Sequence, residues 1–211
     1  YRICRPEAKN TNFWSRIKLG EERCNFIANL PVFYEFYMSG HLIRLFHASP
    51  FSLEHIYNPT FSNKGTIYSG VELDSPEELF ENTEFLGKTK DDKIPDVIGY
   101  GHIHTPFLIR HKNKTIFNPG SVGSPVEMLN SDINDISNKF STLASYIILE
   151  GIYQSKDLSS ISFNFVRVPY DIEKEIQDLI ESDMPNKEIS INALKGALPN
   201  TSIKKRSEFD E

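Results

Sequence analysis

Residues 96–106 read DVIGYGHIHTP, the most informative stretch of the chain. Its first five residues form an apolar run typical of a buried strand, and the remainder begins at Gly101 and contains His102 and His104. In an extended backbone, side chains two positions apart share one side, with their Cα atoms about 6.6 Å apart. We therefore expect the two imidazoles to converge while Ile103 points into the core. Gly101 would permit a positive φ or a close backbone approach.

A third histidine follows another predicted strand. His47 comes directly after the apolar residues 41–46, so three histidines each end an apolar segment. The carboxyl ends of strands are where open α/β folds build their sites, and two rings could serve two metal ions about 3.5–4 Å apart. A His-x-His pair taken alone is more often structural or incidental than functional, and the conjunction of three such histidines favours a site. We expect His41 and His111 to be turn or surface residues and His55 to be a loop contact.

Residues 118–123, NPGSVG, form a second glycine-containing segment after a predicted strand. Asn118, Gly120 and Ser121 are candidates for a loop that supports the histidines. Such a segment can form a nest of backbone N–H groups or a tight turn that positions the histidine loop. We favour the turn, and backbone donors to a histidine ring are an intermediate possibility.

Hydrophobic periodicity predicts strands and helices in alternation, which favours an α/β fold. The predicted helices cover residues 20–30, where the helix would cover a sheet, 75–87, and 172–180. The predicted strands cover 32–38, 41–46, 96–100, 107–110, 115–117, 143–149 and 161–168, with a hairpin turn at Ser39-Gly40 and another at Lys112-Asn113. Residues 51–73 read as a long functional loop and residues 130–139 as an inserted loop.

Composition excludes several classes of protein. The 211 residues are 39% hydrophobic, and acidic residues exceed basic ones by 29 − 23 = 6, which argues against nucleic-acid binding. The strongest basic cluster, residues 204–206, lies in a polar tail that we expect to be disordered. Cys4 and Cys24 lack Cys-x-x-Cys spacing, and no apolar run approaches the ~20 residues that span a bilayer. We expect a cytoplasmic protein with reduced thiols and no membrane association.

The three motifs together resemble the calcineurin-like metallophosphoesterase superfamily, in particular its small bacterial phosphodiesterase branch. They are LFHASP at residues 45–50, GHIHTP at 101–106 and NPGSVG at 118–123, and the resemblance covers residues 20–149. It implies a four-layer αββα sandwich with two divalent metal ions at the strand ends. Manganese is the expected metal, with iron, zinc or cobalt as alternatives.

The resemblance also assigns roles to the histidines and names a substrate class. His47 and His102 match ligands of one ion, and His104 matches a ligand of the other. The implied activity is hydrolysis of a small-molecule phosphate ester or phosphodiester.

The chain departs from the superfamily pattern in one respect. Three motifs that the family places upstream are absent: Asp-x-His, Gly-Asp-x-x-Asp and Gly-Asn-His-Asp/Glu. We therefore expect the catalytic residues and the first strands of the sandwich to lie in an N-terminal segment outside this sequence. The chain by itself should be inactive, and its unpaired strand edges should favour aggregation or oligomers.

Three regions and two rival functions follow from this interpretation. We expect a metallophosphoesterase domain over residues 1–168, a helical extension over 169–200 and a tail over 201–211. The main rival is a non-catalytic scaffold on the same fold that binds a protein partner. A second rival is a phosphoprotein phosphatase, a choice that the loop at 51–73 would decide.

Overall fold

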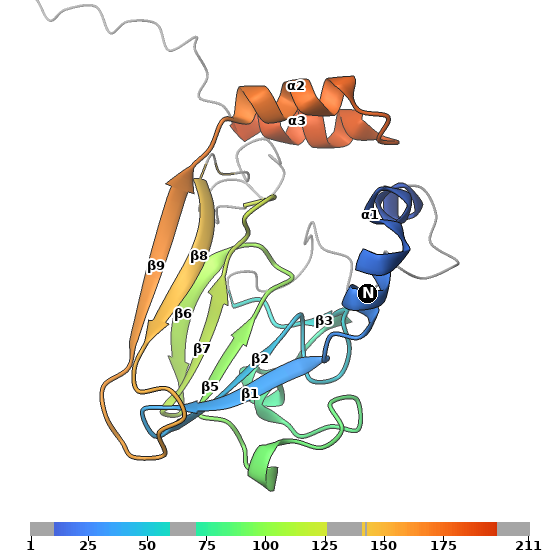
Figure 1. Ribbon diagram of the computed structural model, residues 1–211. Helices are drawn as coiled ribbons and strands as arrows, with labels where there is room; N and C mark the ends of the chain where they lie inside the picture. Colours follow the sequence, from blue (N-terminus) through green and yellow to red (C-terminus); the bar gives the residue numbers. More distant parts are fainter. Residues whose placement is uncertain (1–10, 60–70, 126–140, 142, 198–211) are drawn as a thin grey trace, which may run out of the picture.

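A five-stranded mixed sheet forms the centre of the protein (Figure 1). The computed structural model describes residues 11–59, 71–125, 141 and 143–197. The sheet has the order β1-β2-β5-β7-β6, with parallel pairing of β2, β5 and β7 and an antiparallel hairpin at each side. Its strands are β1 (Phe33–Met38), β2 (His41–Phe46), β5 (Val97–Tyr100), β6 (Pro106–His111) and β7 (Lys114–Pro119). The carboxyl ends of the three parallel strands therefore meet at one edge.

Both hairpins form at the predicted turns. Ser39 and Gly40 have φ values of 50° and 81°, and Lys112 and Asn113 have 45° and 63°. Two consecutive residues with positive φ are the signature of the two-residue hairpin turns whose twist matches that of the strands. The turns thus set the registers in which Met38 pairs with His41 and in which the last residue of β6 pairs with the first of β7.

Each face of the sheet has its own hydrophobic cluster. On the first face, side chains such as Ile98, Tyr100 and Ile116 pack beneath the chain that follows β2. This cover contains β3 (His55–Ile56), β4 (Val71–Glu72) and the 3-10 helices η1 (Pro76–Phe80) and η2 (Lys90–Asp92). On the second face lies the separate hairpin of β8 (Leu143–Glu150) and β9 (Ser162–Pro169), which packs against β1, β2, β5 and β7.

The cover of the first face differs from the sequence prediction in two places. The loop expected at 51–73 contains a short parallel ladder of β3 and β4. The helix expected at 75–87 is only the five-residue η1, although the predicted capping box at Ser75 and Glu78 is present. It ends at Glu81 because the backbone there is extended, and the Glu81 carbonyl and the Asn82 side chain both accept hydrogen bonds from Arg44. A tertiary contact replaces the helical continuation.

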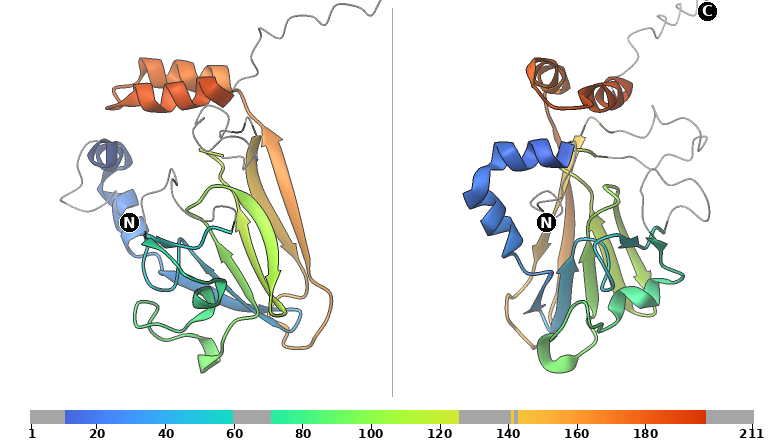
Figure 2. Two further views of the ribbon diagram at one scale, coloured as in Figure 1. Left: turned by 180° about the vertical axis from the view of Figure 1, so that it is seen from behind. Right: turned by 90° about the vertical axis from the view of Figure 1, so that its right-hand side faces the viewer.

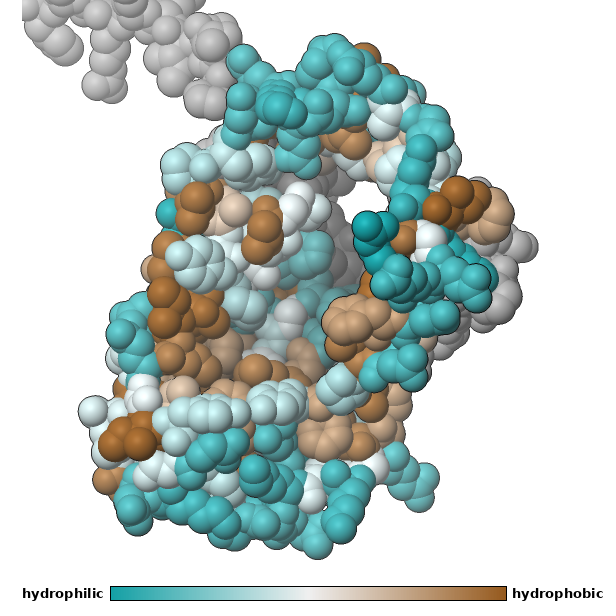
Figure 3. Space-filling model, in the orientation of Figure 1, coloured by the Kyte–Doolittle hydropathy of each residue, from teal (hydrophilic) through white to brown (hydrophobic). Residues whose placement is uncertain are grey.

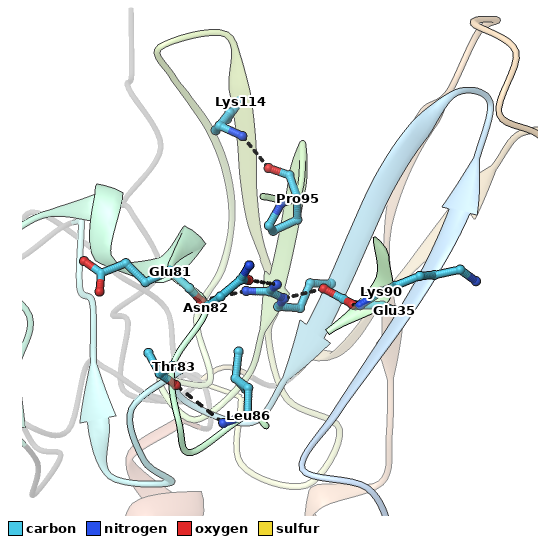
Figure 4. A network of polar contacts seen from close by, with 9 residues as sticks. Glu35, Glu81, Asn82, Thr83, Leu86, Lys90, Pro95 and Lys114 are labelled. Atoms are coloured by element: carbon cyan, nitrogen blue, oxygen red, sulfur yellow. Dashed lines mark hydrogen bonds and ion pairs between the residues drawn. The ribbon is translucent and has the colours of Figure 1, made fainter. Parts of the chain in front are cut away.

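Arg44 is the largest fully buried side chain, and sequence periodicity alone does not reveal it. Its Nε donates to Glu35 Oε1 at 2.7 Å, its Nη1 to the Glu81 carbonyl at 2.8 Å and its Nη2 to Asn82 Oδ1 at 2.5 Å (Figure 4). The second oxygen of Glu35 accepts from the backbone N–H of Lys90. Arg44 and Glu35 thus join β1 and β2 to the chain between the end of η1 and the start of η2, and each nitrogen of the guanidinium donates a hydrogen bond.

The predicted helix at residues 20–30 is only part of a longer helix, α1 (Thr11–Ala28). Gly20 has φ 74° and ψ 172°, so the predicted starting point is a kink inside α1. The expectation that this helix covers a sheet is wrong for the described residues, since Ile17 and Phe26 are 61% and 68% exposed. Figure 1 and Figure 2 show α1 standing away from both sheets.

The helical extension is a hairpin of two helices, α2 (Ile172–Glu181) and α3 (Lys187–Ala197). Their apolar side chains form a third cluster, built on Ile172, Ile176, Ile191 and Leu194. Asp183, in the turn between them, accepts a hydrogen bond from Trp14 Nε1 at 2.8 Å and pairs with Lys18 of α1. The inserted loop at 130–139 and the tail at 201–211 lie outside the described residues. The mixed α/β class is as predicted, whereas the four-layer αββα arrangement stays an expectation.

Candidate metal site

The carboxyl edge of the parallel strands collects the predicted site residues. His47 follows β2, His102 lies two positions after β5, and Asn118 is the last residue but one of β7. Because β2, β5 and β7 run parallel and adjacent, segments far apart in sequence meet at this edge. The topology therefore turns three separate motifs into one cluster.

The rings of His47 and His102 are in direct contact. Nδ1 of His102 lies 2.9 Å from Nε2 of His47, and the ring centroids are 4.9 Å apart at an interplanar angle of 81°. Without a cation between them, one ring donates and the other accepts, so the two hold complementary tautomers. A separation of 2.9 Å also suits two adjacent ligands that each bind one ion at about 2.0–2.1 Å. The donor pair therefore fits part of a metal site.

The backbone of the His-x-His segment is not extended, which corrects the sequence prediction. His102 and His104 have φ values of 64° and 59°, in the left-handed region, whereas Gly101 does not. Ile103 is fully buried between them, as predicted, and its N–H donates to the Gly101 carbonyl at 2.7 Å. Left-handed residues other than glycine are costly and cluster at functional sites. A Cβ at Gly101 would lie 3.4 Å from the His47 carbonyl oxygen, an ordinary contact, so neither of the two reasons for glycine expected from the sequence applies there.

The surroundings favour neutral imidazoles. Burial, followed by the proximity of His102 and His104, lowers the pKa of His47. Burial also lowers the pKa of His104, and a hydrogen bond to the backbone of Ser124 opposes that shift. Neutral rings are the form in which histidine binds a metal.

The predicted supporting loop follows β7, and its Gly120 has a positive φ of 82°. Asn118 is fully buried, and its Nδ2 donates to the Gly101 carbonyl at 2.6 Å while its Oδ1 accepts from the Gly120 N–H at 2.9 Å. Ser121 contacts Ser145 of β8, a residue that sequence reasoning missed. No local pattern marks Ser145, because its contact depends on how the second hairpin packs against the first sheet.

The other histidines lie elsewhere. His41 begins β2, at the opposite end of the strand from His47. The ring of His55 lies 6.4 Å from that of Phe51 between centroids, and Nε2 of His111 lies 2.7 Å from Glu77 Oε1. Within the described ranges, no group of three or more histidine, cysteine, aspartate or glutamate side chains is arranged to hold a metal ion. The described residues therefore bring the rings of His47 and His102 together without a third side chain of these types grouped with them.

Comparisons with solved structures identify the fold as that of the metallophosphoesterase type. The crystal structure of a metallophosphoesterase from Sphaerobacter thermophilus matches 93% of this chain and 73% of its own, with a TM-score of 0.53 and 18% identity. The crystal structure of a hypothetical protein from Pyrococcus horikoshii OT3 matches 90% of this chain and 68% of its own, with a TM-score of 0.52 and 16% identity. The predicted fold class is thereby confirmed.

Sequence comparison adds a distant relative without an assigned function. An uncharacterized protein of Methanocaldococcus jannaschii is 25% identical over 187 residues. The match covers 82% of this chain, which spans 59% of the length of that relative. No family model matches the sequence. In the part of the chain that the structure describes, no helix is both long and apolar enough to cross a membrane.

Proposed function

We propose that this protein contributes part of a metal-dependent phosphoesterase that hydrolyses a small-molecule phosphate ester or phosphodiester. The proposal rests on one observation, the contact between His47 and His102 at the carboxyl edge of the parallel strands. Its metallophosphoesterase-type fold supports the same reaction class. The small bacterial phosphodiesterase branch is the subgroup that we favour, on the motifs at residues 45–50, 101–106 and 118–123.

In this proposal the chain's own residues bind and orient the metal. His47 and His102 would hold one divalent ion, and His104 would contribute to a second; manganese is our choice. Two such ions, when bound, activate a water and neutralise charge on the phosphoryl oxygens. Asn118 and the turn that follows keep the rings in place. The residues that transfer protons are unassigned, and the remaining ligands are expected outside the described residues.

Metal titration followed by an activity assay tests this function. The 211-residue chain should bind Mn²⁺ or Zn²⁺ weakly through its histidines, and His102→Ala should abolish the binding. His111→Ala is the matched control, because His111 pairs with Glu77 and makes no contact with the histidine pair. A longer form that restores the upstream motifs should hydrolyse a chromogenic phosphodiester with Mn²⁺, and the 211-residue chain should not. Equal losses of metal binding in the two variants would contradict the assignment.

A protein-binding scaffold is the second candidate. Its support is the incomplete ligand set among the described residues and the exposed apolar side chains of β8, where Tyr146 and Ile148 are 42% and 44% exposed. A scaffold would keep its fold and its partner when His102 is replaced. An enzyme would lose metal and activity together.

A further inference from the structure

Gly101 is held from both sides at the point where the chain leaves β5. Its N–H donates to the His47 carbonyl at 2.9 Å, and its carbonyl accepts from Nδ2 of Asn118 at 2.6 Å. The first bond ties the peptide to the end of β2 and the second to the end of β7. Gly101 therefore has little freedom to move, and its position sets the start of the histidine segment.

His102 follows this clamped residue directly. Its φ of 64° turns the ring toward β2, where Nδ1 meets His47 Nε2. A left-handed histidine persists only when the surrounding structure imposes it. Two hydrogen bonds of Gly101 supply that constraint. One joins it to His47 after β2, and the other joins it to Asn118 of β7.

Asn118 itself is fixed by the loop and by the second hairpin. Its Oδ1 accepts from the Gly120 N–H, and the carbonyl of the next residue, Ser121, accepts from the backbone N–H of Ser145 at 2.9 Å. Ser145 Oγ accepts in turn from the Ser121 N–H at 3.1 Å. Gly120 has φ 82°, and a Cβ there would lie 1.9 Å from Ser145 Oγ, so only glycine fits between the loop and β8. Ser145 is 4% exposed, so its bonds to the loop are shielded from water.

We propose that Asn118 and Ser145 are positioning residues for the histidine pair, which hold the Gly101 peptide so that the His102 ring reaches His47. The inference rests on the proposed function, because it assigns residues that serve the same metal site. Both polar atoms of the Asn118 amide are required, Nδ2 as a donor to the Gly101 carbonyl and Oδ1 as an acceptor from the Gly120 N–H. An aspartate would place an oxygen against the Gly101 carbonyl. A leucine would leave that carbonyl with the Ile103 N–H as its remaining donor and would leave the Gly120 N–H without the Asn118 acceptor, so the tie between β7 and Gly101 would be lost.

The experiment compares three variants in the full 211-residue chain with a matched control. They are Asn118→Leu, Asn118→Asp and Ser145→Ala. The control is Ser39→Ala, since Ser39 is equally buried and its Oγ donates to the Ser160 carbonyl at 2.8 Å and accepts from the Ile152 N–H at 3.0 Å. It removes two comparable hydrogen bonds at the β1–β2 turn, at the opposite end of β2 from His47.

Two readouts are measured for each protein. Long-range ¹H–¹⁵N spectra without metal report the tautomers of His47 and His102 and therefore their ring contact. Calorimetry with Zn²⁺ reports the dissociation constant. Both Asn118 variants should lose the complementary tautomers and weaken Zn²⁺ binding about 10–100-fold, the usual effect of removing an outer-shell partner. Ser145→Ala should change the tautomers and the Zn²⁺ dissociation constant less than the Asn118 variants do. Ser39→Ala should lower the melting temperature and leave the tautomers and the dissociation constant unchanged.

The outcomes separate this inference from the proposed function. If the wild-type chain binds no Zn²⁺ but the Asn118 variants still lose the ring contact, the positioning role stands and the metal function fails. If Asn118→Leu does not fold, the long-range ¹H–¹⁵N spectra of Asn118→Asp and Ser145→Ala test the positioning role in its place. Unchanged tautomers in the folded Asn118 and Ser145 variants overturn the proposal. So does an equal loss of the ring contact in Ser39→Ala.

Discussion

The two faces of the central sheet differ in the kind of layer that covers them. On the first face, Ile98 and Ile116 are fully buried, and the cover is tied down by Arg44. On the second face, the hairpin of β8 and β9 only half buries Ile147 and Phe163. Its outer side also exposes apolar residues, and Figure 3 shows apolar side chains gathered over this hairpin beside a hollowed surface. The sheet side chains of the second face, such as Ile43 and Val97, are buried as well, so the contrast lies in the covering hairpin and not in the sheet itself.

This difference shows that one sheet can be covered on one face by a loop-rich segment held by a buried ion pair and on the other by a half-buried hairpin. The candidate metal site lies at an edge to which both the sheet and the hairpin contribute, because Asn118 is in the first sheet and Ser145 is in the hairpin. Substitutions in the sheet and in its covering layers measure this difference.

The largest effect is expected at the buried ion pair of the first face. Arg44→Met leaves the carboxylate of Glu35 buried without its partner, and breaking such a pair costs about 3–5 kcal/mol. Urea unfolding followed by circular dichroism measures the loss. The double variant Arg44→Met/Glu35→Leu should recover part of it, because it removes both charges. A loss below about 1 kcal/mol in the single variant would be incompatible with a desolvated pair.

Two isoleucines compare an enclosed position of the central sheet with a half-buried position of the covering hairpin. Ile98→Ala should destabilise the protein by about 2–5 kcal/mol, since it empties a fully enclosed site. Ile147→Ala makes the same chemical change in the half-buried layer and should cost less than half as much. Chemical denaturation of both variants gives the ratio. Equal losses would mean that the hairpin position is packed as tightly as the sheet position.

Self-association should depend on the outer side of the hairpin. Exposed apolar faces and open strand edges favour association, so Tyr146→Lys/Ile148→Thr should shift the chain toward monomer with little change in unfolding free energy. Sedimentation velocity measures the shift. Leu108→Thr is the control, because Leu108 is 40% exposed on β6 of the other sheet. Association that responds equally to the control would show that the hairpin face has no special role.

The smallest effect concerns an exposed carboxylate on the cover of the first face. Hydrogen bonds from Lys112 and His111 lower the pKa of Glu77 to about 2 from 4.5. A lowered pKa in the folded state means that the stabilisation is present above pH 4.5 and is lost as the pH falls toward 2. Carboxyl ¹³C titration should show this value, and Lys112→Ala should raise it toward 4.5. An unchanged titration in the variant would rule out Lys112 as the main cause.

Several features of the fold follow from local sequence alone. The hairpin turns at Ser39-Gly40 and Lys112-Asn113 have positive φ at both residues, and the second residue of each, glycine or asparagine, adopts it readily. The strands are predictable because their apolar side chains alternate or run continuously, and helix α2 because its isoleucines recur at helical spacing. Local chemistry is sufficient where neighbouring residues determine the backbone.

The sequence motifs also mark the histidines as candidate site residues. The three segments at 45–50, 101–106 and 118–123 predict both the fold type and the convergence of His47 with His102. Parallel strands place their carboxyl ends together, so each histidine that follows such a strand is brought to the same edge. Whether these rings hold a metal stays a prediction.

Only the tertiary structure decided how those parts are held. The left-handed backbone of His102 and His104, the burial of Arg44 and the early end of η1 all depend on partners far away in sequence. The link from Ser145 to the loop after Asn118 has the same origin. Local patterns encode which face of an element is apolar, whereas a polar side chain becomes buried only when distant segments supply its hydrogen bonds.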